Sequence, residues 1–566
     1  MAEYLSPGVY VEEIDNGPRS IEGVGTSTAG FVGMAEKGPI EGAPELITNF
    51  NSFLRIYGGF LSDFTHGEYR FLAYAVEQFF TNGGTRCYVM RVAPDDAKAA
   101  SKKLGFITAK AVNPGKWGDK IVITLTQSSK RKIQFMEKIS DTTYKVKNAE
   151  DIHEGDIIVF EKEFNTVTGV YDRELTLANP FKADVVDKEL IPKKVVNLVE
   201  TDMTIRYQDQ IENYPGINFI QGSKDYVINR TERSEIATIE INGSPKGINP
   251  LAEIFEKDAT SISFTLEGGS DGSISKVNAG TFIGMDKGPG HRTGIQSFLE
   301  NSIVSMMAVP GVTMPEVQVA LVAHCENLGS RFAVLDMPEK ISKPKELIEF
   351  RGLIDSTYAA MYHPWVQVFD RSANKPSYIP PSGSVLGVYS RTDINRGVHK
   401  APANETVACT GLSINYTKAE QDILNPEGIN LIRALPGQGI RIWGARTASS
   451  SSSFRYINVR RLFIFVEESI KASTNWVVFE PNDSMLWSRV SLTVASFLDN
   501  LWKAGMLAGD SASEAYFVEI GTNTMSRDDI ENGRLICNIG IAPTKPAEFV
   551  IFRISQFTAE AGGGEE

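Results

Sequence analysis

The sequence predicts an α/β (α+β) fold whose core is interrupted by a β-rich insertion and carries a strand-like arm at each end. Helical patterns followed by short apolar strands occur in residues 21–103 and again in residues 281–420, which is typical of a parallel sheet covered by helices. Residues 104–280 instead alternate apolar and charged side chains and contain few helical patterns. Strand-like runs also stand near both termini, as SPGVYVEEI (6–14) and PAEFVIFRISQFT (546–558).

The first part of the core predicts a strand, a helix and a second strand. A short apolar strand is expected within GVGTSTAGFVGMAEKGP (23–39), between turn-forming residues. CYVMRV (87–92) predicts a buried strand. Between them an amphipathic helix is expected to end at Gly83 and Gly84, because apolar residues recur at helical spacing at Phe71, Leu72, Ala75, Phe79 and Phe80.

The second part of the core repeats this alternation. NSIVSMMAVPG (301–311) ends in an expected strand, and Thr313 is expected to cap a helix that has Pro315 in its first turn and ends at Gly329. RFAVLDMP then predicts a strand, KELIEFRGLI a helix, and MYHPWVQVFD one further strand. A short echo, AGFVGMAEKGP from Ala29 and AGTFIGMDKGPG from Ala279, suggests a shared strand and turn, although two short matches also arise by chance.

The C-terminal part predicts one long amphipathic helix, MLWSRVSLTVASFLDNLWKAGML (485–507), with Leu486, Val490, Phe497, Leu501 and Trp502 on or near one face. YINVRRLFIFVEESIKAS before it fits either a strand or a helix start. The expected division of the chain is an N-terminal arm (1–20), a first core part (21–103), an inserted β-rich outer region (104–280), a second core part (281–420), a C-terminal domain (421–545), and a C-terminal arm and tail (546–566).

Composition limits the classes of function. With 42% hydrophobic and 22% charged residues the chain is globular, and a net charge of -13 argues against a surface that binds nucleic acid over most of the protein. No run of eighteen apolar residues and no secretion signal is visible, so neither membrane insertion nor export is expected. Four separated cysteines without a CxxC pair fit reduced thiols in the cytoplasm better than disulfides or a zinc site.

No constellation of catalytic residues emerges, and no catalytic, cofactor-binding or metal-binding residue is assigned. There is no GxxxxGK[ST] and no HExxH, and a strand rather than a helix follows Ser27, which argues against a nucleophile elbow. His324 and Cys325 are adjacent on an expected helix and so point about 100° apart. The polar stretch from Arg391 to Glu405 fits an anion site or, as the default, a hydrogen-bonded structural loop or subunit contact.

One charge asymmetry stands out in this acidic chain. Between residues 426 and 509 there are nine Arg or Lys residues against six acidic residues. Such a positive region suggests a docking face for an acidic surface, unless the arginines pair internally with Glu467, Glu468, Glu480 and Asp483. The residues that we expect to face a partner or a neighbouring subunit are Arg460, Arg461, Lys471, Arg489 and Lys503.

The two terminal strands predict assembly. An alternating strand at the end of a chain is an aggregation hazard unless its edge is used, and one use is strand addition to a neighbouring subunit. Arms that reach different neighbours make heterologous contacts, which close into rings or continue as helices. The alternative is that both strands pair within their own subunit.

Several long motifs, in order, resemble the contractile tail sheath proteins of bacteriophages and phage-derived injection systems. They cover roughly residues 1–100 and 290–558 and include SPGVYVEEI, AVEQFFTNGGTRCYVMRV, RTGIQSFLENSIVSMMAVPG, YHPWVQVFD, PPSGSVLGVYSRTDINRGVHKAPANE, GINLIRALPGQGIRIWGARTAS, FEPND and APTKPAEFVIFRISQ. The resemblance implies a non-enzymatic subunit of a helical sheath of stacked, six-fold rings, which surrounds an inner tube and contracts to drive that tube through a target cell envelope.

The resemblance also implies partners and sites. The partners are other copies of the chain, the inner tube protein, and baseplate and terminator proteins, with no direct nucleic acid and no cofactor. The arms that would enter a neighbour's C-terminal sheet are represented by Val9, Tyr10, Val11, Phe549, Ile551, Phe552 and Ile554. The inserted region does not match and is expected to face solvent, and assembly is expected in the bacterial cytoplasm. The alternative function is a baseplate or tube-associated structural protein of the same particle.

Overall fold

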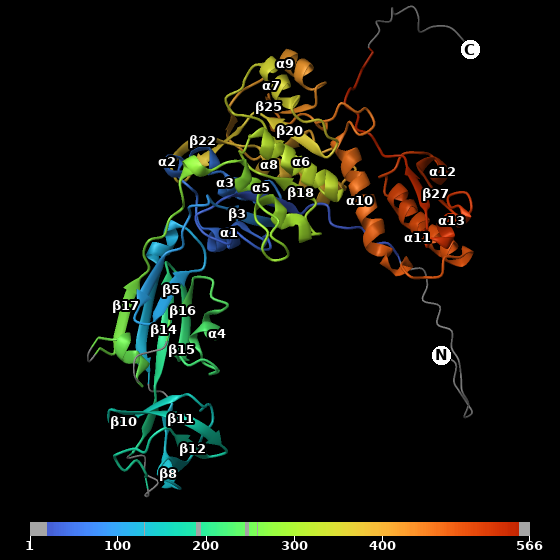
Figure 1. Ribbon diagram of the computed structural model, residues 1–566. Coiled ribbons are helices and arrows are strands. Elements are labelled where there is room, and N and C mark those ends of the chain that lie inside the picture. Colours follow the sequence, from blue (N-terminus) through green and yellow to red (C-terminus); the bar gives the residue numbers. More distant parts are fainter. Residues whose placement is uncertain (1–19, 129–130, 188–193, 244–247, 257–258, 554–566) are drawn as a thin grey trace, which may run out of the picture.

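A computed structural model describes residues 20–128, 131–187, 194–243, 248–256 and 259–553 (Figure 1). A nine-stranded sheet forms the centre of the molecule. Its order is β2 (Glu45–Ile47), β3 (Cys87–Val92), β1 (Ala29–Met34), β18 (Met306–Ala308), β19 (Phe332–Asp336), β20 (Ala359–His363), β25 (Ile429–Leu435), β26 (Gly439–Ile442) and β23 (Glu405–Thr406). The strands from β3 to β25 are parallel to their neighbours, and β2, β26 and β23 pair antiparallel at the edges.

Helices cover both faces of this sheet, as the alternation of helix and strand predicts. Phe31 of β1 belongs to the apolar cluster that contains residues of α3 (Leu72–Thr81) and α8 (Ser382–Arg396), whereas the next residue, Val32, belongs to the cluster on the opposite face. That second cluster includes residues of α5 (Ala279–Ile283), α6 (Pro315–Leu328), α7 (Pro344–Arg351) and α9 (Lys418–Leu424). Smaller elements at the periphery are α1 (Phe50–Tyr57), α2 (Asp63–His66), and a three-stranded sheet of β22 (Lys375–Ile379), β21 (Val366–Asp370) and β24 (Gly411–Leu412).

The inserted region consists of two modules, one inside the other. Next to the core lie a four-stranded sheet of β15 (Gln210–Ile217), β14 (Glu200–Tyr207), β6 (Val122–Ser128) and β17 (Ser261–Thr265), a three-stranded sheet of β16 (Ala237–Ile241), β5 (Ile107–Ala111) and β4 (Ser101–Leu104), and α4 (Val227–Thr231). Between β6 and β14 the chain forms a seven-stranded sheet with its own core, the tip module: β7 (Lys132–Ile133), β13 (Val196–Leu198), β10 (Ile157–Phe160), β11 (Glu163–Tyr171), β12 (Glu174–Leu177), β9 (Thr143–Val146) and β8 (Phe135–Lys138).

Two buried cations attach the insertion to the core. Arg91 of β3 is 1% exposed and donates to the carbonyl oxygens of Ala35 at 2.9 Å, Gly38 at 3.1 Å and Pro114 at 2.7 Å. The Nζ of Lys37 lies 4.7 Å from the ring centroid of Tyr207 on β14. These contacts hold the insertion in a fixed direction away from the sheet.

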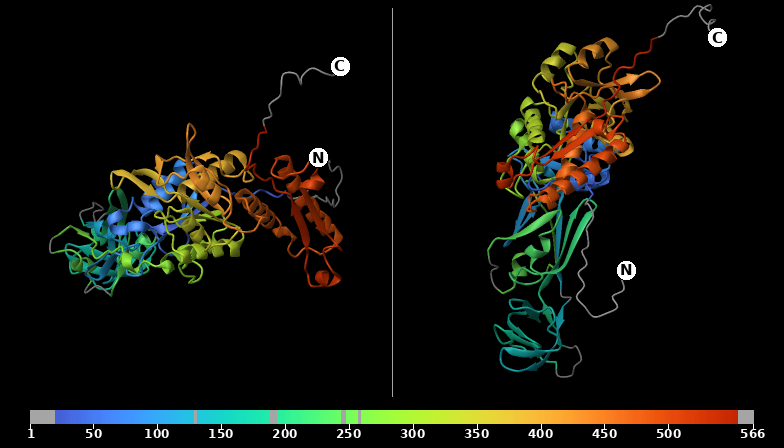
Figure 2. Two further views of the ribbon diagram at one scale, coloured as in Figure 1. Left: turned by 90° about the horizontal axis from the view of Figure 1, so that it is seen from above. Right: turned by 90° about the vertical axis from the view of Figure 1, so that its right-hand side faces the viewer.

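The C-terminal domain lies beside the core, well separated from the tip module (Figures 1 and 2). It contains α10 (Ile457–Ser473), α11 (Ser484–Lys503), α12 (Ala512–Ala515), α13 (Arg527–Glu531) and a hairpin of β27 (Tyr516–Ile520) and β28 (Cys537–Ile541). The expected helical face of α11 is confirmed, since Leu486, Val490, Phe497 and Leu501 are buried. The ambiguous segment before it is the helix α10.

Several local expectations were wrong. MYHPWVQVFD forms two strands, β20 and β21, in different sheets, because the chain turns away at Pro364, which has no N–H to donate. The residue that caps α6 is Met314 rather than Thr313, with Pro315 at the first helical position. The second copy of the short echo begins as the helix α5 rather than a strand.

The limit expected at residue 420 also falls inside the core. Strands β25 and β26 follow it, yet both belong to the nine-stranded sheet. We therefore propose that the C-terminal domain begins after β26, and keep the other limits of the six-part division as proposals.

Candidate assembly surfaces

The C-terminal arm leaves the core at one anchored residue, Glu548. Its Oε1 accepts hydrogen bonds from Asn425 at 2.6 Å and from Nε of Arg446 at 2.9 Å. Its Oε2 accepts from Nη2 of Arg446 at 2.8 Å and from the hydroxyl of Tyr456 at 3.0 Å. Burial alone would raise the pKa of Glu548, but the hydrogen bonds from these three side chains outweigh it, and the pKa lies below its ordinary value. The carboxylate is thus held ionised at neutral pH.

Beyond this anchor the arm is apolar and uncovered. Phe549, Val550, Ile551 and Phe552 are 73%, 68%, 77% and 84% exposed, and residues 546–553 form no strand. The strand expected here is therefore not formed within the subunit over the described residues. Ile554 lies outside the described residues, as do Val9, Tyr10 and Val11 of the N-terminal arm.

The N-terminal segment 20–28 connects the C-terminal domain to the core sheet, and we call it the strap. The N–H of Val24 donates to Oγ of Ser469 on α10 at 3.1 Å, and a Cβ on Gly23 would lie 2.8 Å from the ring of Phe465. Closer to the sheet, the carbonyl of Thr26 accepts hydrogen bonds from Ser305 at 2.6 Å and from Arg461 at 3.0 Å. The position from which the N-terminal arm leaves is therefore fixed by both α10 and the core.

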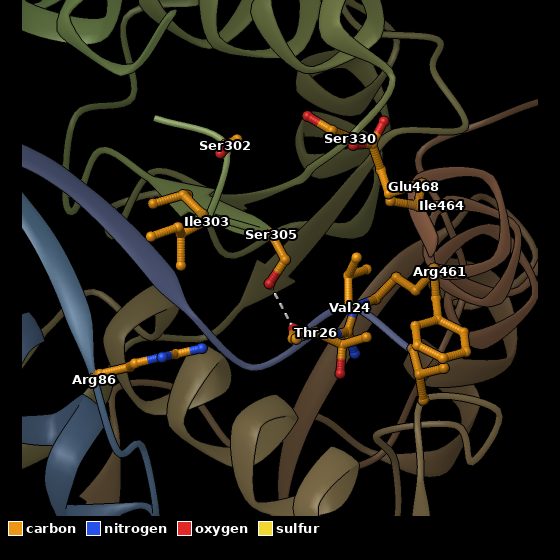
Figure 3. A pocket seen from close by; sticks show the side chains of 14 residues that line it. Val24, Thr26, Arg86, Ser302, Ile303, Ser305, Ser330, Arg461, Ile464 and Glu468 are labelled. Atoms are coloured by element: carbon orange, nitrogen blue, oxygen red, sulfur yellow. Dashed lines mark hydrogen bonds between the residues drawn. The ribbon is translucent and has the colours of Figure 1, made fainter. Parts of the chain in front are cut away.

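A cavity of about 240 Å³ lies beside the strap. Figure 3 shows its walls, which come from the strap, from the loop before β18 and from α10. Arg86 and Glu468 are among the lining residues, but Arg86 donates to Thr28 and Glu468 pairs with Lys471. Nothing in this lining defines a ligand.

The hairpin β27–β28 offers two open strand edges. The N–H of Ala542 donates to the carbonyl of Ala515, which fixes the hydrogen-bonding pattern of the hairpin. Because hydrogen-bonded and non-hydrogen-bonded pairs alternate in an antiparallel ladder, residues 516, 518 and 520 of β27 and residues 537, 539 and 541 of β28 point their N–H and C=O groups outward. In the part of the chain that the structure describes, no further strand pairs with either edge. This geometry suits addition of an extended segment from elsewhere.

Two of the five expected surface cations are internal, which corrects that assignment. Arg461 is 4% exposed and makes a two-pronged ion pair with Asp393 of α8, at 3.0 and 2.6 Å. Arg460 is 8% exposed, and its guanidinium lies 3.5 Å from the ring centroid of Phe454. The partner of Arg461 is distant in sequence, whereas Phe454 lies close to Arg460 in the chain.

The other three cations lie at the surface. Lys471 pairs with Glu468 at 3.1 Å, Lys503 pairs with Asp499 at 2.6 Å, and the guanidinium of Arg489 lies 4.8 Å from the ring centroid of Trp476. They remain candidates for contact with a tube or another subunit.

The polar stretch 391–405 has a structural role. Its first residues, Arg391 to Arg396, belong to α8 and are not a loop. Arg391 donates to the carbonyls of Asn82 and Thr406, and Lys400 to those of Ala401 and Ala403. The default expectation of hydrogen-bonded structure is thus supported for Arg391 and Lys400.

The side chains considered for chemistry are unsuited to it. His324 is buried beside Arg331, and burial followed by the charge of Arg331 lowers its pKa to about 4. Burial raises the pKa of Cys325 to about 12, so the thiolate is disfavoured. Within the described ranges, no three His, Cys, Asp or Glu side chains gather where a metal could bind, and no helix is long and apolar enough to cross a membrane.

The two features that matter most here, the Glu548 anchor and the open hairpin, were not found from the sequence. Glu548 stands one residue before an apolar run and looks like an ordinary solvated acid. Its three donors come from segments 92 to 123 residues away, so no spacing rule connects them.

Comparisons with known proteins agree with an assembly role. The family model described as the phage tail sheath protein central domain matches residues 287–448, and that of the phage tail sheath C-terminal domain matches residues 449–557. A prophage major tail sheath protein of Pseudomonas aeruginosa is 25% identical over 292 residues, which are 49% of this chain and 73% of that protein. The tail sheath protein of Salmonella phage ViI is 27% identical over 225 residues, 37% of this chain and 34% of that protein.

A solved structure has the same fold over nearly the whole chain. The sheath complex of an extracellular contractile injection system, PVC, in the contracted state matches with a TM-score of 0.54 and 21% identity, covering 99% of this chain and all of that one. The matched domains and the fold thus define a structural protein of the tail sheath class. The chain belongs to the phage tail sheath family and is a component of a contractile phage tail or phage-like injection particle.

Proposed function

We propose that the chain polymerises helically around an inner tube, in stacked six-fold rings, and contracts to drive that tube through a target cell envelope. The observation that carries this proposal is that one subunit has both an anchored, exposed apolar arm and, elsewhere, a hairpin with open edges. A surface and its complement at different places on one molecule make a heterologous contact, which links successive copies into a ring or an open helix.

The arms supply the connection between subunits. The C-terminal arm, with Phe549, Ile551, Phe552 and Ile554, and the N-terminal arm, with Val9, Tyr10 and Val11, add strands to the β27–β28 hairpins of neighbours. Each backbone hydrogen bond contributes about 0.5–1.5 kcal/mol net, so one short strand contributes a few kcal/mol per contact. Repetition in every subunit makes the lattice stable while the arms let the subunits move.

The two ends of the molecule then have different surroundings. The C-terminal domain faces the tube and carries Lys471, Arg489 and Lys503 at its surface, which suits an acidic tube surface. The inserted modules project from the core away from the C-terminal domain (Figure 1), and we expect them to face solvent in the assembly.

The work of contraction comes from conformational energy stored during assembly, as in a bistable lattice. The chain acts without enzymatic activity, nucleotide or cofactor. Assembly takes place in the bacterial cytoplasm, with the inner tube, baseplate and terminator proteins as further partners, without direct contact to nucleic acid and without insertion into a membrane.

Negative-stain electron microscopy of the purified protein tests this function. We expect striated tubes in a long, narrow form and a short, wide form. Discrete single rings would instead favour the alternative of a baseplate or tube-associated protein. Removal of residues 1–14 is expected to leave folded subunits that no longer form connected tubes, and normal tubes from that variant would contradict the role of the N-terminal arm.

A further inference from the structure

An aromatic ring covers a glycine on the outer face of the hairpin. Phe517 of β27 stands directly opposite Gly540 of β28. A Cβ on Gly540 would lie 2.0 Å from Cε1 of Phe517, so the ring occupies the place where any other side chain would be. Phe517 is nevertheless 53% exposed. The ring therefore lies flat across both strands with one side open.

The two faces of the hairpin differ. Alternate residues of both strands, including Tyr516, Val518 and Ile539, pack against the apolar cluster of α10 and α11. The opposite face presents Phe517, Glu519, Asn538 and Gly540. Phe517 is thus the apolar contact that this outer face offers to a strand added at either edge.

The C-terminal arm has an apolar side chain at every position from Phe549 to Phe552. In a strand these side chains alternate between the two faces, so the strand is fully covered only where both faces meet apolar surface. The N-terminal arm has a shorter apolar run, Val9 to Val11, which ends at Glu12 and Glu13. The hairpin offers the helical layer on one face and Phe517 on the other, which fits the C-terminal arm.

The C-terminal arm is directed away from the hairpin of its own subunit. Glu548 fixes the exit point of the arm at the core, and Figures 1 and 2 show the chain from there running away from β27. The exposed run Phe549–Phe552 is left without cover in its own subunit.

We infer that the Phe517 ring, held over Gly540, receives the C-terminal arm of a second copy of this chain and packs against an apolar side chain on the arm's outer face. This inference rests on the proposed strand addition and names the surface that selects the C-terminal arm. The ring contributes specificity beyond the backbone hydrogen bonds, which any extended segment can make.

The full-length variants Phe517→Ala and Phe517→Leu test this role, with Phe64→Ala as a matched control, because Phe64 is 99% exposed on α2 in the core. The readout is the protein concentration at which tubes form, measured by sedimentation. We expect Phe517→Ala to raise this concentration about fivefold, Phe517→Leu to raise it less, and Phe64→Ala to leave it unchanged. Thermal unfolding of the unassembled subunit checks that the fold is intact.

A double-mutant comparison tests whether the side chains of Phe517 and Phe552 act together. Phe552→Ala combined with Phe517→Ala is expected to raise the concentration by less than the product of the two single effects. Wild-type assembly by Phe517→Ala would overturn the inference, as would an effect of the same size from Phe64→Ala. Deletion of residues 546–566 separates the two proposals: if it abolishes tubes while Phe517→Ala does not, the arm is needed but Phe517 is not its contact.

Discussion

The guanidinium of Arg446 and the carboxylate of Glu548 form a two-pronged ion pair, with Nε to Oε1 at 2.9 Å and Nη2 to Oε2 at 2.8 Å. Arg446 is itself 8% exposed, and its N–H donates to Asn430, so it belongs to the core. Over the residues that the structure describes, the pair joins the last anchored residue, Glu548, to the nine-stranded sheet. It is the structural reason that the C-terminal arm starts from a defined place.

Loss of this anchor should weaken assembly more than folding. We expect Glu548→Ala to lower the free energy of unfolding of the isolated subunit by about 1.5–3 kcal/mol, because it leaves the mostly buried guanidinium of Arg446 without its charged partner. We expect its tubes to be shorter and to form at higher concentration, since the arm no longer leaves in one direction. Urea unfolding and sedimentation measure the two effects. Exposed Glu349 on α7, away from the hairpin, gives the control Glu349→Ala. Loss of stability in Glu548→Ala without any change in assembly would contradict the anchoring role.

The stabilisation contributed by the Glu548 carboxylate should change with pH only under acidic conditions. Since the folded-state pKa of Glu548 is lowered, its stabilising contribution is present above the unfolded pKa of 4.5 and is lost as pH falls through the folded value. The difference in melting temperature between wild type and Glu548→Gln should be constant above about pH 5 and shrink below it. Differential scanning calorimetry over this range provides the measurement, and a difference that grows toward acid would refute the sign.

The buried pair between Arg461 and Asp393 should be costly to break. Arg461→Met leaves Asp393 ionised and unpaired where both side chains are 2–3% exposed, which is expected to cost about 3–5 kcal/mol of unfolding free energy. Arg461→Met with Asp393→Leu should recover much of this loss. The exposed pair of Lys503 and Asp499 supplies the control, since Lys503→Met should cost no more than about 1 kcal/mol. If Arg461→Met and Lys503→Met lowered the free energy of unfolding equally, this would argue against a buried structural pair.

The tip module should be removable. Ser128 of β6 pairs with Glu200 of β14, so a short turn can replace residues 129–199 without disturbing the sheet below. Glu200 loses its partner Arg131 in this deletion, and its side chain is 1% exposed, so Glu200→Gln should accompany it. We expect a folded protein that forms tubes of smaller outer diameter in electron micrographs. Failure to assemble, despite a normal melting transition, would show that the tip module contacts other subunits.

The order in which the four cysteines are alkylated should follow their burial. Burial raises the pKa of Cys325 to about 12 and that of Cys87 further, whereas Cys409 and Cys537 are only partly buried. Iodoacetamide at pH 8 should therefore modify Cys409 and Cys537 before Cys87 and Cys325, as measured by peptide mass spectrometry. Rapid labelling of Cys325 in the folded protein would reopen the question of a reactive thiol.

Much of the fold follows from local sequence pattern. The helix α3, the strand β19 and the buried face of α11 each follow from apolar periodicity, because a helix or strand must bury its apolar side wherever it packs. The failures have tertiary causes. Pro364 sends one apolar run into two sheets, and residues 421–442 look like the start of a new domain although the core sheet recruits β25 and β26.

The candidate surfaces were harder to predict than the fold. Arg460 and Arg461 stand between the apolar residues Val459 and Leu462, but only the placement of α10 beside α8 shows that Arg461 faces Asp393, 68 residues away. The apolar run of the C-terminal arm, by contrast, was visible at once in the sequence. Its exposure in the isolated subunit is what distinguishes an assembly arm from a core strand.

The sequence by itself determined the alternation of helix and strand, the β-rich insertion and the presence of an apolar arm, because these depend on residues close together in the chain. Only the tertiary structure decided that the insertion is one module inside another, that Glu548 anchors the arm, and that Phe517 lies over Gly540. Each of these features depends on side chains or strands from distant segments of the chain. Local periodicity cannot predict such contacts, because it depends only on residues that are close in sequence.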